Sequence, residues 1–233
     1  FVLSLTAEHC NQDNIYHIDK RLHRRVKTLK IDKNMSLFSI FGGSKKSQYP
    51  TDEVVYDDDN KVIFTFFKHA SLSITIGDKI IYTDPVAAYA KYSQLPKADL
   101  VLVTHSHYDH LDRAAIDDIT TRDSIIVCDK TSAEAFEGEC VLMTPGMKAV
   151  AFDKIHIEAI AAYNTTEGHT DFHPKAREDC GYVLTIDNIF RLMIPGAPRP
   201  TPEMLALKDI DVACLPVNQP YTNNTFDGDG SYD

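Results

Sequence analysis

Four side chains of the kinds that bind metal ions lie together directly after an apolar segment, and this feature constrains the fold most. Residues 104–112 are THSHYDHLD, so His105, His107, Asp109 and His110 fall within six positions. Residues 100–103 are Leu-Val-Leu-Val, which is typical of a buried strand. Because the end of a rigid strand holds the following loop in place, several side chains can converge there on one point.

The residue types in this run favour a transition-metal site. Imidazole suits Zn, Fe, Mn or Ni, and a carboxylate suits the harder members of that set. The His-x-His alternation puts two rings on one side of an extended segment, and the Asp109-His110 pair can then turn toward a second ion. One such histidine alone would more simply be a hydrogen-bonded surface or core residue. For all four together we predict one or two ions, Zn²⁺ first, with Mn²⁺, Fe²⁺ or Ni²⁺ as alternatives.

Length and charge bound the class of protein. The 233 residues suit one α/β domain with a substantial core, and no apolar run approaches the roughly 18 residues of a membrane-spanning helix. Residues 1–50 carry 9 Lys+Arg against 4 Asp+Glu (+5), whereas residues 51–233 carry 15 against 30 (−15). An acidic body repels phosphate backbones. We therefore expect a small-molecule substrate and no nucleic acid, and no oligomeric state follows from the sequence.

The chain divides near residue 50. Residues 1–50 lack a clear period and are rich in Lys, Arg, Asn and Ser, which predicts a divergent, loosely structured basic extension before a domain over residues 51–233. Residues 1–7, FVLSLTA, match the end of a secretory signal peptide but also suit an arbitrary start. The compartment, cytoplasmic or exported, thus stays open.

From residue 62 the pattern changes to short strands bounded by turn residues. Helices fall between groups of strands, which favours helices covering stacked sheets. We expect helices at 113–120, at 132–136 and from 202, and strands at 62–67, 71–76, 79–83, 100–104, 124–128, 148–152, 154–161, 181–186, 189–194 and 211–217.

The run at residues 105–110 matches an HxHxDH signature, and several further segments carry the same resemblance. They are KHASL at 68–72, YTDPV at 82–86, AYN at 162–164, FHPK at 172–175, GY at 181–182, PEM at 202–204, IDV at 210–212 and LPVNQPYT at 215–222. Over roughly residues 60–222 the chain thereby resembles the metallo-β-lactamase superfamily and, within it, the ascorbate-phosphate lactonase-like branch, a relative of N-acyl phosphatidylethanolamine phospholipase D.

This resemblance implies an α/β fold, an αββα sandwich with metals at one edge, and leaves open whether C-terminal closing elements are missing. It implies His105, His107 and His173 as ligands of a first metal, with His169 as the alternative to His173, and Asp109 and His110 as ligands of a second. Asp84 would orient a ligand histidine, and its alternative is a turn residue before Pro85.

Two departures from the family pattern bear on the second metal. The family's Gly-Asp-Thr is Gly196-Ala197-Pro198 here, so a methyl group replaces a bridging carboxylate, and no histidine follows His173. The second site would keep only Asp109 and His110. We treat His69 as a packed histidine. Tyr163, Asn164 and Lys175 are treated as plain surface residues.

The predicted activity is hydrolysis of an ester, lactone, amide (including β-lactam) or phosphodiester bond by metal-activated water, with Asp109 as the catalytic residue that positions or deprotonates the water. A single-metal mechanism is favoured because of Ala197. The alternative is a catalytically impaired or truncated metal-binding relative that acts as a ligand- or partner-binding protein. A third interpretation, a pH-responsive histidine cluster without an ion, explains the spacing poorly.

Overall fold

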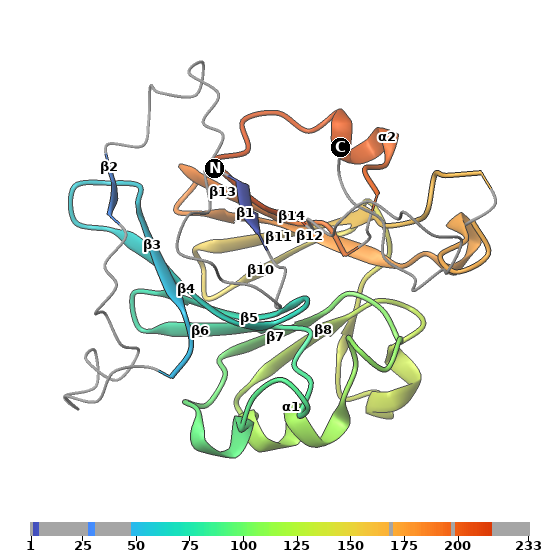
Figure 1. The fold of residues 1–233 in the computed structure, drawn as a ribbon, viewed down its shortest axis with the longest axis horizontal. Coiled ribbons are helices and arrows are strands. Elements are labelled where there is room, and N and C mark those ends of the chain that lie inside the picture. Colours follow the sequence, from blue (N-terminus) through green and yellow to red (C-terminus); the bar gives the residue numbers. More distant parts are fainter. Residues whose placement is uncertain (1, 5–27, 31–47, 168–169, 197–198, 216–233) are drawn as a thin grey trace.

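Two β-sheets packed face to face make up the protein, and helices lie on their outer faces (Figure 1). The structure is a computed structural model that describes residues 2–4, 28–30, 48–167, 170–196 and 199–215. Within these residues, the six-stranded sheet has the order β1 (Val2–Ser4), β14 (Val212–Leu215), β13 (Phe190–Ile194), β12 (Cys180–Ile186), β11 (Ile155–Ala161), β10 (Lys148–Ala151). The eight-stranded sheet has the order β2 (Thr28–Lys30), β3 (Thr51–Val55), β4 (Lys61–Lys68), β5 (Ser71–Ile76), β6 (Lys79–Thr83), β7 (Leu100–Val103), β8 (Ile125–Cys128), β9 (Val141–Leu142).

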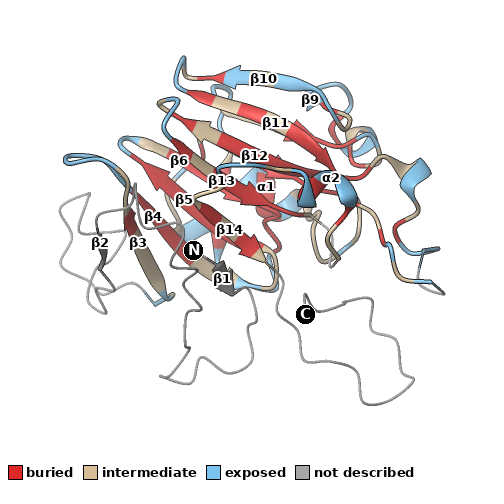
Figure 2. Cartoon of the chain, turned by 90° about the horizontal axis from the view of Figure 1, so that it is seen from above, coloured by how far each residue is buried: buried red, intermediate tan, exposed pale blue. Residues whose placement is uncertain are grey.

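Strand β7 shows why the sequence LVLV forms a strand that is apolar on both faces. Leu100 and Leu102 point into the core between the sheets, whereas Val101 and Val103 pack on the opposite side against Ile116 and neighbouring residues. All four side chains are fully buried, and buried residues also run along strands such as β4, β5, β12 and β13 (Figure 2). Burial of this kind contributes roughly 25 cal/mol per Å² of apolar surface, so the strand end that carries His105 is firmly held.

The two α-helices are short, and a side chain caps the N-terminus of each. Asp112 caps α1 (Arg113–Ile119) by accepting hydrogen bonds from the backbone N–H groups of Ala114 and Ala115. Thr201 caps α2 (Pro202–Leu205) in the same way. Three 3₁₀ turns complete the helical elements of the described residues: η3 (Tyr92–Gln94), η4 (Ala133–Phe136) and η5 (Lys175–Arg177). None of the helices in the described part of the chain is long and apolar enough to cross a membrane.

This arrangement confirms the predicted sandwich of two sheets with outer helices. The strands expected between residues 62 and 194 are present, and their ends differ from the expected ones by at most one residue. The helix expected at 132–136 is a 3₁₀ turn, and strands β1, β2, β3 and β9 were not predicted. Two of these, β1 and β2, come from the segment expected to be loosely structured, and they pair with β14 and β3. The rest of residues 1–47 and residues 216–233 lie outside the described residues, and the boundary at residue 50 stays a prediction.

Strand register brings the segment ends together at one edge of the sandwich. In the parallel pair β6 and β7, Thr83 lies opposite Leu102, so the residues that follow both strands lie side by side. The two sheets meet there as well, because Cys180 N–H donates to the Thr104 carbonyl at 3.1 Å and Tyr182 Oη donates to the Val103 carbonyl at 2.7 Å.

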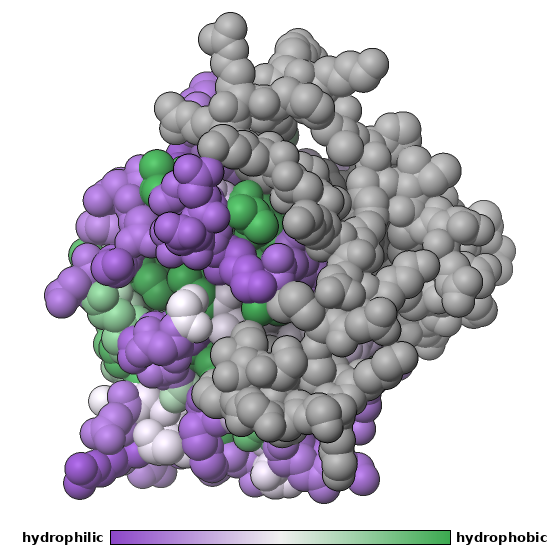
Figure 3. Space-filling model, turned by 90° about the vertical axis from the view of Figure 1, so that its left-hand side faces the viewer, coloured by the Kyte–Doolittle hydropathy of each residue, from purple (hydrophilic) through white to green (hydrophobic). Residues whose placement is uncertain are grey.

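One outer face of the molecule is seen in Figure 3. Its coloured part is mainly hydrophilic with scattered hydrophobic residues, which is the pattern of a solvated surface.

Candidate metal centre

A first group of three histidines converges at this edge. His105 and His107 follow β7, and His173 comes from the segment between β11 and β12. Ring centroids lie 4.7 Å apart for His105 and His107, 4.7 Å for His105 and His173, and 4.6 Å for His107 and His173. One ligand nitrogen from each ring lies within 4.8 Å of the others. Such a cluster of nitrogens is a candidate site for one shared cation, which would lie about 2 Å from each of them.

His105 carries a buried nitrogen that the protein does not satisfy. The residue is 1% exposed, and its Nδ1 lies 3.0 Å from Thr104 Oγ1. Its Nε2 has no hydrogen-bond partner among the described residues. Leaving a buried polar nitrogen unpaired costs about 1–3 kcal/mol, and such a group calls for an explanation. A cation that accepts the Nε2 lone pair supplies one.

Asp179 and Arg177 hold the rings of this group in place, and neither was singled out from the sequence. Asp179 Oδ2 lies 3.0 Å from His173 Nδ1, which directs His173 Nε2 toward the other histidines. Arg177 Nε donates to Asp179 Oδ1 at 3.1 Å, and its NH1 lies 3.0 Å from His107 Nε2. Nothing in the local sequence marks them, because both contacts depend on how the segment folds against β7.

A second group consists of His69, Asp109 and His110, again with one ligand atom from each within 4.8 Å of the others. His69 Nε2 lies 3.2 Å from His110 Nε2 and 3.3 Å from Asp109 Oδ2. The sequence predicted a packed histidine at position 69, whereas the structure places His69 among ligand-type atoms. The rings of His105 and His110 are only 3.9 Å apart, so the two groups adjoin.

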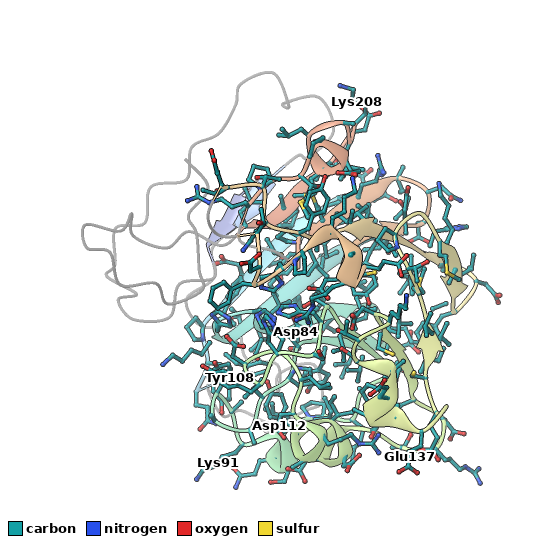
Figure 4. The ribbon with its side chains drawn as sticks, turned by 90° about the vertical axis from the view of Figure 1, so that its right-hand side faces the viewer. Asp84, Lys91, Tyr108, Asp112, Glu137 and Lys208 are labelled. Carbon is teal, nitrogen blue, oxygen red and sulfur yellow. The ribbon has the colours of Figure 1, made fainter. Side chains whose placement is uncertain are left out.

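Buried Asp84 contacts the second group through His110 and lies in the interior of the molecule (Figure 4). Its Oδ2 lies 2.8 Å from His110 Nδ1, and it accepts hydrogen bonds from Thr104 N–H at 2.8 Å and Thr104 Oγ1 at 2.7 Å. Its backbone φ is +40°, a conformation that Asp tolerates better than most residues. Ser71 Oγ donates to its carbonyl. The contact to His110 supports the proposed orienting role.

Burial and charge keep His105 and His107 neutral and Asp109 ionised. Burial, together with the neighbouring rings of His110 and His173, lowers the pKa of His105 well below 6.5. Burial, His173 and Arg177 lower the pKa of His107 to about 4. For Asp109, burial raises the pKa, but the hydrogen bond with His69 and the electrostatic interaction with His110 outweigh it and bring the pKa to about 2. Neutral imidazole and ionised carboxylate are the forms that bind cations.

The pKa of His107 predicts how the stability of the metal-free protein changes with pH. Between pH 6.5, the ordinary value, and pH 4 the unfolded chain binds more protons than the folded one, so the free energy of unfolding decreases as the pH falls through this window. Since the ring is partly exposed, we expect His107 to account for only about 1–2 kcal/mol. Urea unfolding from pH 7 to 4.5 measures it. His107→Gln should flatten the curve, and an identical slope in that variant would contradict the assignment.

Three residues that were expected to be plain surface residues, Tyr163, Asn164 and Lys175, make specific contacts in the structure. Asn164, treated as surface, is 5% exposed, and its backbone N–H donates to the His173 carbonyl at 2.9 Å. Tyr163 and Lys175 both contact Glu203 at the start of α2, at 2.9 and 2.8 Å, and Lys175 lies over the Tyr163 ring. His169 and Ala197 lie outside the described residues, so the preference for His173 over His169 stays a prediction.

Comparisons with known proteins agree with this architecture. The model of the beta-lactamase superfamily domain matches residues 63–227. A UPF0173 metal-dependent hydrolase of Pyrococcus furiosus is 30% identical over 171 residues, which cover 68% of this chain and 73% of the relative. A UPF0173 metal-dependent hydrolase of Polaromonas is 25% identical over 178 residues, 66% of this chain and 65% of the relative. The match therefore spans between just under two thirds and about three quarters of these relatives.

A solved structure extends the likeness to three dimensions. A Parabacteroides distasonis protein assigned as a metal-dependent hydrolase superposes with a TM-score of 0.69 and 41% identity, covering 75% of this chain and 78% of that one. Fold and site define a two-sheet sandwich with ligand-type side chains at one edge. The chain belongs to the metallo-β-lactamase superfamily. The predicted membership of this superfamily of metal-dependent hydrolases is thus confirmed.

Proposed function

We propose that the protein is a hydrolase in which His105, His107 and His173 hold a catalytic cation, and that it cleaves an ester, lactone, amide or phosphodiester bond of a small molecule. The buried Nε2 of His105, which has no hydrogen-bond partner in the described part of the chain, is the observation that carries this proposal. Three converging imidazoles match the three protein ligands of a catalytic zinc site, which keeps a further position open.

Zn²⁺ is the proposed cation because the first group offers nitrogen donors only. When bound in such a site, Zn²⁺ lowers the pKa of coordinated water to about 7 and so supplies hydroxide at neutral pH. Mn²⁺, Fe²⁺ and Ni²⁺ remain alternatives that also bind imidazole. The resemblance to the ascorbate-phosphate lactonase-like branch places lactones first among the substrates to be tested.

Asp109 acts in this proposal by position rather than as a strong base. Its pKa of about 2 leaves it ionised at neutral pH and makes it a poor proton acceptor. The carboxylate, with a side chain 27% exposed, can accept a hydrogen bond from water at the adjoining groups and orient it. Asp179 and Arg177 hold the His173 and His107 rings in the positions from which they would bind the cation.

Removing the cation tests the proposal. Dialysis against a chelator is expected to reduce turnover of a panel of lactones, β-lactams, aryl esters and phosphodiesters to the uncatalysed rate, because no side chain of the site replaces a cation in activating water. Adding back Zn²⁺ should restore the rate, with elemental analysis reporting the ions per chain.

Full activity in metal-free protein would contradict the proposal. Stable metal binding with no turnover on any member of the panel would instead favour the alternative function, a metal-binding relative that recognises a ligand or partner. The sequence motivates that alternative through Ala197, which has no donor atom where the family pattern has a bridging carboxylate.

A further inference from the structure

His69 lies on a backbone that is shaped around the site. It follows β4 and precedes β5, and the register of this hairpin shifts between Phe66 and Lys68. Such irregularities re-aim side chains and are frequent beside functional sites. His69 has a φ of +53°, an uncommon conformation for a residue with a side chain. Strain of this kind persists where the surroundings fix it.

The strained backbone directs the ring to the second group. His69 Nε2 approaches both His110 Nε2, at 3.2 Å, and Asp109 Oδ2, at 3.3 Å. The His110 ring is fixed from its other side by Asp84 at Nδ1, so its Nε2 lone pair faces His69. Two imidazole nitrogens and a carboxylate oxygen thus surround one point, with a second carboxylate, Asp84, behind them.

We propose that His69 is the third protein ligand of a second cation, shared with Asp109 and His110. This inference rests on the proposed function in taking the neighbouring histidines as a metal site. A donor set of two imidazoles and one carboxylate suits Zn²⁺ or Fe²⁺ and disfavours Ca²⁺ and Mg²⁺, which prefer oxygen ligands. The second site thereby has three protein ligands, whereas the sequence predicts only two, and the protein binds two ions per chain.

Counting the ions in a variant without the ring tests this inference. His69→Gly removes the imidazole and suits the positive φ, so the variant is expected to fold with a melting temperature at least as high as that of the metal-free native protein. Titration with Co²⁺, followed by visible absorption and by elemental analysis after gel filtration, should give two ions for the native chain and one for the variant. The affinity for the second ion should fall by at least about 100-fold.

His156→Gly would place glycine within strand β11, so His156→Gln serves as the control; it alters a histidine that belongs to neither group and should keep two ions. Two ions bound with unchanged affinity in His69→Gly would overturn the inference, and so would a native chain that binds one ion only. A native chain that binds no ion would instead refute the proposed function.

A measurement on the native chain makes the test independent of any variant. Diethyl pyrocarbonate acylates accessible imidazole nitrogens, and mass spectrometry locates the modified residues. Between one and two equivalents of Zn²⁺, the modification of His69 should drop sharply while that of His156 stays constant. Equal modification of His69 at zero, one and two equivalents would also overturn the inference.

Discussion

Replacing His105 and His107 together by alanine is expected to abolish ion binding at the first group and to reduce hydrolysis to the uncatalysed rate. The double variant leaves His173 as the one remaining ligand of that group, and a single imidazole does not hold a catalytic cation. Elemental analysis should show one ion fewer per chain than the native protein, and the substrate panel should show no turnover.

The fold of this double variant should survive, which separates loss of function from loss of structure. His105 Nε2 makes no hydrogen bond with the described residues, and the two groups that lose a histidine contact, Thr104 Oγ1 and Arg177, keep their hydrogen bonds to Asp84 and Asp179. Circular dichroism and thermal unfolding of the metal-free forms provide the check, with His156→Ala as the matched control. Undiminished ion content and turnover in a folded double variant would refute the assignment of both histidines.

Replacing Asp84 by alanine is expected to have the largest effect on stability. Its buried carboxylate accepts hydrogen bonds from Thr104 N–H and Thr104 Oγ1 and contacts His110 Nδ1, and alanine would leave these groups without it. Leaving buried donors unpaired costs about 1–3 kcal/mol each, so we expect a loss of about 3 kcal/mol or more in the free energy of unfolding. Urea unfolding of the metal-free protein measures this loss.

Asp84→Asn separates the orienting role from the role of a turn residue. Asparagine keeps the size and tolerates the positive φ of +40°, so its stability should lie between those of the native protein and the alanine variant. If Asp84 fixes the His110 ring, affinity for the ion at Asp109 and His110 should fall about 10–100-fold in the asparagine variant. A residue needed only for the turn before Pro85 would leave that affinity unchanged.

The sequence predicts those parts of the structure whose signal is local. β5 alternates polar and apolar residues, β7 is a continuous apolar run, and α1 begins at a capping Asp112, so their positions follow from neighbouring residues alone. Strands β3 and β9 were not predicted, because their neighbouring residues alone do not mark them as strands. β9 has two exposed residues, and its strand conformation depends on pairing with β8.

The same distinction applies to the site. His105, His107, Asp109 and His110 are visible as a motif because one strand end carries them all. His69 lies 41 residues before His110, and its contact there depends on the register of β4 and β5. Asp179 and Arg177 likewise reach the first group only through packing of their segment against the end of β7.

Crystals of the purified protein soaked in Zn²⁺, with diffraction data collected on both sides of the zinc absorption edge, test the central claim most directly. The account predicts an anomalous peak about 2 Å from nitrogens of His105, His107 and His173, and a second about 2 Å from His69, Asp109 and His110. Well-ordered imidazoles with no anomalous peak between them would contradict it.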